Sequence, residues 1–565
     1  MHEEFISQAR TAYFSMEIAL RTDIPTYSGG LGVLAGDTLR SAADLGLPLV
    51  GVTLVSREGY FRQELDARGQ QTEHPEPWDP AERCHCVLKA KITVPIEERQ
   101  VWVGGWLYVL EGFVGGRQPV ILLDTDLPEN TREDRMLTHH LYGGDAIYRL
   151  KQEMVLGVGG VRMLHALGFD IRRYHMNEGH SALLALELLR RHAYAPDDVR
   201  PGEPRYDIPL VRAMCNFTTH TPVEAGHDQF PYELALPVLS ELIDYPLLKS
   251  FAGPDNLNMT RLALSLSDFV NGVAKRHAEV SRQMFPGYRV RAITNGVHPF
   301  TWTAPSFVKL YDLYVPGWGY EPELLVRADQ IPNDAIRQAH VEAKHTLIDA
   351  VKERTGVTLH PKVPILGFAR RMTGYKRPDL LFADLERLKA IAAQWPFQIV
   401  LAGKAHPHDE GGKRLIETLH EHIAALAGSI PMAFVPNYDM QMARLLVAGA
   451  DVWLNTPLRP LEASGTSGMK AAFNGVPSLS VLDGWWIEGC IEGVTGWAIG
   501  NSASAPNSGD AASLYDKLEQ VVLPLYYYAA REQWIAVMKG AICKNASFYN
   551  SQRMMRRYVT EAYLH

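Results

Sequence analysis

The chain has 565 residues, of which 46% are hydrophobic and 21% are charged. These values are ordinary for a soluble globular protein, and the length predicts several domains or two large ones. The formal net charge of −8 offers no basic face to a polyanion, and no run of eighteen apolar residues could cross a membrane. We therefore expect neither nucleic acid nor a membrane among the partners.

The five cysteines do not suggest a disulfide framework and fit a reducing compartment, so a cytoplasmic location is expected. The N-terminus also lacks the basic and then apolar pattern of a secretion signal. Cys84, His85 and Cys86 stand side by side, but a closed zinc site needs a second ligand pair at a suitable spacing. The pattern favours a strand with thiols packed on one face, and no metal is expected.

In the first half of the chain, residues 11–17 and 47–56 predict strands, and residues 26–46 predict a glycine turn that opens a helix. Residues 172–191 and 214–230 each combine an apolar stretch with a polar, histidine-bearing turn. The glycines of the turn leave backbone amides uncovered for an anion or a sugar hydroxyl. A tight connection between strand and helix explains the same glycines equally well.

The second half alternates short apolar runs with amphipathic ones. This pattern predicts a parallel sheet wrapped by helices, in which ligands bind at the C-terminal ends of the strands. The expected strands are residues 363–371, 397–403, 432–437, 451–456 and 478–484, and the expected helices include 377–393 and 413–427. The polar segments 370–377, 403–413 and 456–470 all follow such strands.

Turn residues and aromatics interrupt the pattern between Asn295 and Trp302, where two lobes are expected to meet. The sequence therefore predicts an α/β fold of two facing lobes, residues 1–300 and 301–565, the second ending in helices. A cleft at such a junction is the expected place for a small ligand.

Two of the polar segments carry chemistry. Four cations lie within residues 370–377 of a chain that is acidic overall, which indicates an anion such as phosphate, although a solvated basic turn remains the alternative. Residues 464–468 can offer hydroxyls and amides to a second phosphate, next to Lys470. A lysine in a semi-buried cationic setting loses its proton readily and can form a Schiff base with an aldehyde. Pyridoxal 5′-phosphate carries both an aldehyde and a phosphate.

These motifs resemble those of the glycogen or α-glucan phosphorylases, and particularly their compact bacterial and archaeal branch. The segment "EASGTSGMK" is similar to the family's pyridoxal phosphate lysine motif, and the other motifs follow in family order between residue 11 and about residue 500. They are "YFSMEIALRTDIPTYSGGLGVLAGD", "HMNEGHSALL", "FTTHTPVEAGHD", "ITNGVHPFTW", "FARRMTGYKRP" and "LDGWWIEG".

The resemblance implies two facing Rossmann-like lobes of the GT-B type and assigns roles to residues of this chain. Lys470 is the implied cofactor lysine, and Arg371, Lys376 and His220 complete the implied catalytic set. The other implied cofactor contacts are Thr466, Ser467, Gly468, Arg370, Trp302 and Tyr438. The implied contacts to the sugar are Glu462, Ser464, Gly465, Asn295, Gly30, Leu31 and Tyr375. His220, Trp302 and Tyr438 could equally be core residues.

Some positions depart from the longer phosphorylases. Thr373 and Gly374 replace a histidine and an acid, Ser28 replaces an asparagine, and Arg370 replaces a lysine. These departures put fine contacts to the sugar in doubt, and with them the preferred chain length. They do not affect Lys470.

The implied reaction is reversible phosphorolysis of terminal α-1,4-glucosidic bonds, which releases α-glucose 1-phosphate with retention. The partners would be an α-1,4-glucan such as glycogen or maltodextrin, inorganic phosphate and glucose 1-phosphate; a homodimer is common in the family. No convincing pair of carboxylates for a retaining glycosidase appears in the sequence. Two alternatives remain, a nucleotide-sugar-dependent glucosyltransferase and a non-catalytic glucan-binding relative, and neither needs "EASGTSGMK".

Overall fold

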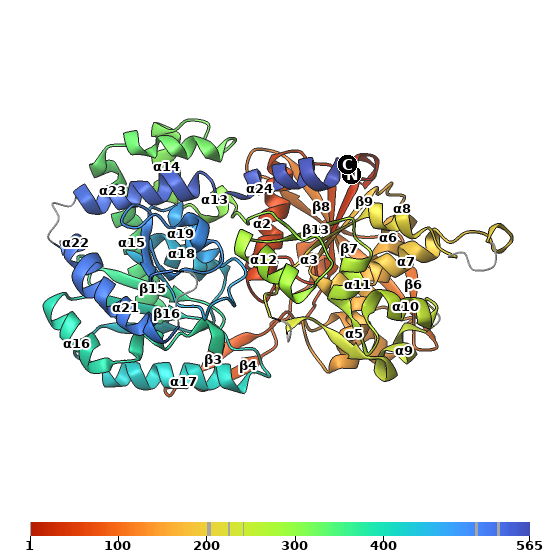
Figure 1. Ribbon diagram of the computed structural model, residues 1–565, viewed down its shortest axis with the longest axis horizontal. Helices are drawn as coiled ribbons and strands as arrows, with labels where there is room; N and C mark the ends of the chain where they lie inside the picture. Colours follow the sequence, from red (N-terminus) through yellow and green to blue (C-terminus); the bar gives the residue numbers. More distant parts are fainter. Residues whose placement is uncertain are drawn as a thin grey trace.

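The computed structural model describes residues 2–199, 205–223, 226–240, 242–502, 507–527 and 532–564. Two blocks lie side by side in Figure 1, each built on one large sheet surrounded by helices. The chain is therefore of the mixed α/β class, with parallel strands at the centre of both sheets, as the sequence predicts.

The first sheet has ten strands, with parallel pairing at its centre and antiparallel pairing at one edge. Its order is β14-β13-β10-β9-β1-β2-β8-β7-β5, and β6 also pairs with β7. The parallel part contains β1 (Thr11–Phe14), β2 (Leu49–Leu54), β9 (Arg173–Asn177), β10 (Cys215–Thr218), β13 (Phe269–Gly272) and β14 (Arg291–Ala292). The antiparallel edge contains β5 (Cys86–Val87), β6 (Ile92–Ile96), β7 (Arg99–Glu111) and β8 (Arg117–Asp124), of which β8 pairs parallel with β2.

The cysteine cluster lies at this edge. The expected single strand with both thiols on one face is wrong, because Cys84 ends the short helix α3 (Pro80–Arg83) and only Cys86 lies in a strand. His85 is held by the backbone, since its Nδ1 accepts from the amide of Val109 at 3.0 Å. Across the described ranges, no group of three or more histidines, cysteines and acids could hold a metal.

The second sheet has six parallel strands in the order β17-β16-β15-β18-β19-β20. They are β15 (Ile365–Ala369), β16 (Gln398–Ala402), β17 (Met432–Val435), β18 (Val452–Asn455), β19 (Ser478–Val481) and β20 (Gly496–Ile499). Every residue of these strands is buried, which explains their continuous apolar runs. The first five are the expected strands.

One of the expected helices is shorter than the sequence suggests. The segment 377–393 forms a helix only from Leu385, in α16 (Leu385–Gln394). Asp384 stops its extension, because its carboxylate caps the helix by accepting from the amide of Arg387 at 2.9 Å. The neighbouring α17 (Glu410–Ala425) covers the expected 413–427 region. No helix in the described part of the chain is both long and apolar enough to cross a membrane.

The chain passes between the blocks twice at one place. Val297, on the outgoing crossing, accepts from the amide of Ser551 and donates its own amide to Tyr549 on the returning crossing, at 2.9 and 3.0 Å. The last long helix, α24 (Ser551–Tyr558), then packs against α2 (Gly30–Asp44) of the first block. The C-terminal residues thus complete the core of the first block, and the expected boundary at residue 300 stays a prediction.

A hairpin of the first block reaches over the second one. Its strands, β3 (Arg62–Leu65) and β4 (Gln71–His74), lie beside α17 in Figure 1. The amide of Gln63 donates to Asn437 Oδ1 at 3.0 Å, and the amide of Asn437 donates to Gln63 Oε1 at 2.9 Å. Gln71 pairs likewise with the backbone of Ala405, at 3.0 Å in both directions. Buried amide side chains thus join the two blocks.

Replacing Gln63 by alanine is expected to loosen this hairpin. The variant leaves the amide of Asn437 and the carbonyl of Gly403 without their Gln63 partners, and an unsatisfied buried group costs about 1–3 kcal/mol. Hydrogen exchange of the peptide around Asn437 should accelerate by about tenfold or more. The control is Q70A, at an exposed position of the same hairpin. Equal exchange in Q63A and Q70A would contradict the role of Gln63.

Candidate active site

Lys470 lies in the short helix α19 (Ser467–Ala472) of the second block. Its side chain is 8% exposed, and its Nζ lies 4.0 Å from the centroid of the Trp302 ring. Burial lowers the pKa of Lys470 to about 8, against a smaller opposing effect of Asp37. An amine with such a pKa is neutral in a far larger fraction of molecules near physiological pH than an ordinary lysine, and its neutral form is a competent nucleophile.

The position of Trp302 relative to Lys470 is fixed from both blocks. The indole Nε1 of Trp302 donates to Asp37 Oδ2 at 2.7 Å, and Asp37 lies in α2. Asn474, one turn beyond Lys470, donates to the carbonyl of Trp302 at 2.8 Å and accepts from the amide of Ala304 at 2.7 Å. The aromatic wall over Lys470 is therefore rigid.

Glu462 forms the second feature of the site, a buried ion-pair cluster. Its carboxylate accepts from Lys376 Nζ at 2.7 and 2.9 Å, and Arg370 lies 2.7 Å from the same group. Burial alone would raise the pKa of Glu462, but the two cations outweigh it and lower the pKa to about 2. Glu462 is thus an anion at all physiological pH values, with both oxygens turned toward cations.

Arg371 differs from its neighbour Arg370. Its side chain is exposed, and it makes neither a hydrogen bond nor an ion pair with any residue that the structure describes. A Cβ placed on Gly29 would lie 3.6 Å from Arg371 Nη2, so this guanidinium faces the glycine turn of the first block. Gly30 begins α2 beside it with open space around its Cα, and Leu31 follows half-buried. An uncommitted cation at the junction of the blocks suits an anionic ligand.

The backbone around Arg371 is held in place by the hairpin. The amide of Met372 donates to the carbonyl of Lys404 at 3.0 Å, and the amide of Arg370 donates to that of Ala402 at 3.2 Å. The segment from Gly403 to Ala405 is in turn bound by Gln63 and Gln71. The hairpin therefore supports the loop that carries the cations.

The loop before Lys470 is shaped by close packing. A Cβ on Gly468 would lie 2.8 Å from Ser478 Oγ and from the Trp485 ring, so only glycine fits at position 468. Gly465 has a φ of +78°, a conformation that favours glycine. Thr466 precedes α19, and Ser467 Oγ accepts a hydrogen bond from the indole N–H of Trp453 at 3.0 Å. Ser464 is 5% exposed, and its Oγ has no partner among the described residues.

The remaining expected residues divide between the blocks. Tyr375 lies against Lys376, whose Nζ is 4.5 Å from its ring centroid, and Tyr438 lies close enough to Arg370 for its charge to act on the phenol. His220 Nε2 donates to Asn177 Oδ1 at 2.6 Å, and burial lowers the pKa of His220 to about 3. Asn295 is buried, and its Oδ1 has no partner in the described part of the chain.

The structure thus brings Glu462 together with Arg370 and Lys376, and Lys470 together with Trp302. His220 and Asn295 stay in the first block, and among the described residues no hydrogen bond or ion pair joins them to these two groups. Their roles remain predictions.

Sequence reasoning missed Glu17 and Asp37, two buried acids of the first block. Glu17 accepts from the amides of Ser28 and Gly29 at 2.6 and 3.2 Å and from Tyr142 at 2.9 Å, so it fixes the glycine turn. Both acids interrupt otherwise apolar or small-residue runs, and an acid in such a place needs a buried partner. That signal could have found them.

The Glu462 cluster predicts a pH dependence. A carboxylate whose pKa falls on folding stabilises the protein fully above its unfolded pKa, near 4.5, and loses that contribution as the pH falls toward 2. The difference corresponds to roughly 3 kcal/mol. The gap between the urea midpoints of wild type and E462Q should therefore narrow as the pH is lowered from about 5 to about 2. For E421Q, at an exposed site, the difference from the wild-type midpoint should not change with pH. The same constancy in E462Q would contradict the predicted role of the Glu462 carboxylate.

Comparison with known proteins identifies the family of this chain. Residues 247–495 match the family described as carbohydrate phosphorylase. The chain is 39% identical to the maltodextrin phosphorylase of Thermococcus litoralis, over 98% of this chain and 70% of that protein. It is 36% identical to the glycogen phosphorylase of Mycobacterium tuberculosis, with the same coverage, and 35% identical to that of Aquifex aeolicus, over 98% of this chain and 85% of the relative. The chain belongs to the carbohydrate phosphorylase family.

Proposed function

We propose that the protein is an α-glucan phosphorylase, which cleaves terminal α-1,4-glucosidic bonds of glycogen or maltodextrin with inorganic phosphate and releases α-glucose 1-phosphate with retention. The observation that carries the proposal is Lys470, a buried amine without a hydrogen-bond partner among the described residues. It follows a loop of small residues that begins at Glu462, the partner of Arg370 and Lys376. A nucleotide-sugar transferase or a glucan-binding protein has no use for such a lysine.

The residues fit pyridoxal 5′-phosphate. The amine of Lys470 has its pKa lowered to about 8, and Ser464 Oγ, also buried, lacks a partner in the described ranges. Lys470 would carry the cofactor, with Thr466, Ser467, Gly468 and Arg370 around its phosphate and Trp302 and Tyr438 beside it. When bound, the cofactor supplies a phosphate group that exchanges a proton near neutral pH.

The chain's own residues would bind and orient the substrates. Arg371 and Lys376 would hold inorganic phosphate, because cations are needed to offset the repulsion of two phosphates in one cleft. Glu462 would accept hydrogen bonds from sugar hydroxyls, with Ser464, Gly465, Asn295, Tyr375 and His220 nearby and Gly30 and Leu31 on the opposite wall. His220 would act as a neutral ring, given its low pKa.

The proposal also covers where the ligands bind relative to the two blocks. We place the ligands between the two blocks, as in glycosyltransferases of the GT-B type. The approach of Arg371 to the glycine turn and the hydrogen bond between Trp302 and Asp37 support that placement, since both join the two blocks and Trp302 lies over Lys470.

The test has two independent readouts on the purified protein. Borohydride treatment and peptide mapping should place a pyridoxyl phosphate mass on Lys470, and maltodextrin with phosphate should yield α-glucose 1-phosphate. Glucosyl transfer from a nucleotide sugar without any bound cofactor would refute the proposal. Glucan binding with neither reaction would leave the protein a glucan-binding relative.

A further inference from the structure

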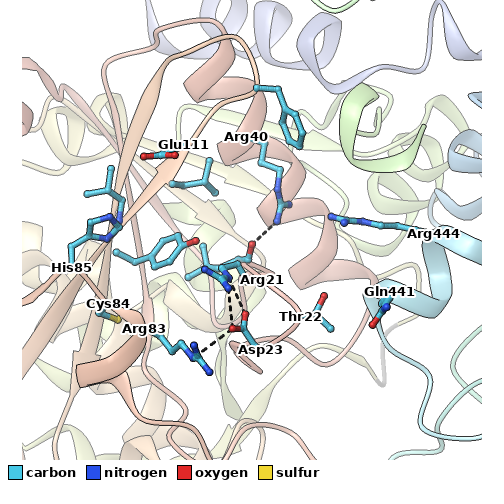
Figure 2. Close-up of a pocket in the computed structure, with 15 residues that line it drawn as sticks. Arg21, Thr22, Asp23, Arg40, Arg83, Cys84, His85, Glu111, Gln441 and Arg444 are labelled. Atoms are coloured by element: carbon cyan, nitrogen blue, oxygen red, sulfur yellow. Dashed lines mark hydrogen bonds and ion pairs between the residues drawn. The ribbon is translucent and has the colours of Figure 1, made fainter. Parts of the chain in front are cut away.

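A cavity of about 910 Å³, which Lys470 does not line, lies between α2 of the first block and α18 (Met440–Gly449) of the second. Figure 2 shows its walls. The loop from Leu20 to Asp23 and strand β7 form one side, and Gln441 and Arg444 of α18 form the other. A ligand in this cavity would contact both blocks.

The cavity carries an excess of positive charge. Four arginines line it, against two carboxylates, Asp23 and Glu111. They are Arg21, Arg40, Arg83 and Arg444. Arg21 and Arg83 share Asp23, at 2.8 and 3.5 Å. The positive excess of two among the lining residues therefore lies mainly with the other two arginines, of which Arg40 also pairs with Asp37, a residue outside the lining.

Arg40 is a buried cation whose hydrogen-bonding capacity is not used up. It is 6% exposed, and its Nη2 donates to the carbonyls of Ala19 and Leu20 at 2.9 and 2.7 Å. Its Nη1 has no hydrogen-bond partner in the part of the chain that the structure describes, although it forms a loose ion pair with Asp37 Oδ1 at 3.6 Å. A buried donor left in this state is costly, and an anion could satisfy it.

Arg444 faces Arg40 from the other block. Figure 2 shows the guanidinium of Arg444 extending from α18 toward that of Arg40. Arg444 forms no ion pair or hydrogen bond with any described residue, and burial lowers the pKa of both arginines. The two cations repel one another, and Asp37, which pairs with Arg40 and whose charge also acts on Arg444, opposes that repulsion. An anion bound between the two guanidinium groups would reduce the repulsion further.

We propose that this cavity binds a small organic phosphate, with the phosphate between Arg40 and Arg444 and the organic part against Tyr108 and Phe113. A phosphate monoester carries a charge of about −1.5 to −2 at neutral pH, which is opposite in sign to the excess charge of the cavity lining. One guanidinium group can donate two parallel hydrogen bonds to two phosphate oxygens. The aromatic side chains offer flat faces on which a sugar or a base can pack. This site goes beyond the proposed function, because none of these residues belongs to the site around Lys470.

The cavity is connected to that site through α2. Arg40 lies one turn after Asp37, whose Oδ2 holds Trp302 over Lys470. A ligand that engages Arg40 and Arg444 would therefore restrain the helix that positions Trp302. It would also stabilise the contact between the blocks, as any ligand of the folded state does.

The test is calorimetric titration of the purified protein with ribose 5-phosphate and with uridine 5′-monophosphate. The probes share the ribose phosphate and differ in the base, so they separate a sugar phosphate from a nucleotide as the source, and either one binding supports the proposal. Ribose itself should not bind. R444E should weaken binding by about tenfold or more, because it reverses one of the two phosphate contacts.

Two matched variants locate the binding. R414E, at an exposed position of α17 outside the cavity, and R371A, in the proposed active site, should each leave the affinity within about twofold. Binding of neither probe, or binding that R444E does not weaken, would overturn the proposal. If R371A lost binding of the probes and R444E retained it, the ligand would lie in the active site, and the proposal would be overturned as well. These results do not depend on whether the protein has phosphorylase activity.

Discussion

Replacing Lys470 by alanine is expected to abolish retention of pyridoxal phosphate and to lower kcat by about a thousandfold or more, the scale of a lost group for proton transfer. The physical reason is the burial of this amine. With a pKa of about 8, roughly half of the Lys470 amines are neutral at pH 8, whereas an ordinary lysine is neutral in well under about 1% of molecules. Among the residues that the structure describes, Lys470 is the one whose amine lies over the Trp302 ring.

The measurement is the mass and absorbance of bound cofactor, followed by the initial rate of glucose 1-phosphate formation. The control is K352A, at an exposed lysine of α15 (Asn333–Thr355), which should keep both properties. The thermal midpoint of K470A checks that the variant is folded. Covalent cofactor and full activity in folded K470A would show that another residue does this work.

The sequence predicts the second sheet well because its strands are buried on both faces. Their apolar runs stand out against the amphipathic helices between them, and five of the six lie where expected. The sixth, β20, has four residues and begins with glycine, so it carries too weak a pattern. Most of the antiparallel edge of the first sheet was missed for a different reason. The half-exposed strand β7 owes its stability to its pairing with β8, which no local pattern reveals.

In the candidate site, too, the sequence reveals what a local motif carries and does not reveal contacts between distant segments. Glu462 and Lys470 lie in one loop, so a local motif predicts both. The partners that fix the site come from distant segments. Asp37 reaches Trp302 only because α2 packs at the junction of the blocks, and Gln63 supports the cation loop only because a hairpin crosses over. Such contacts depend on how the blocks dock, and the spacing of residues in one sequence does not encode that docking in a readable way.

Replacing Arg371 by alanine is expected to lower kcat/KM for phosphate by about a hundred- to a thousandfold, the usual effect of removing one preorganised charged contact. Arg370 and Lys376 are already engaged with Glu462, whereas Arg371 has no ion pair among the described residues. Its charge is therefore the one most available to an incoming anion. R371K should recover part of the activity, since lysine keeps the charge but loses the planar pair of donors.

The decisive comparison is between the two substrates. Because Arg371 faces the glycine turn and is assigned to the phosphate, R371A should raise KM for phosphate far more than KM for maltodextrin. R414A, at an exposed arginine of α17, should change neither constant. A larger effect on maltodextrin would move Arg371 to the glucan side of the cleft. Phosphate binding would then depend on Lys376, which could act only after releasing Glu462 to a sugar hydroxyl.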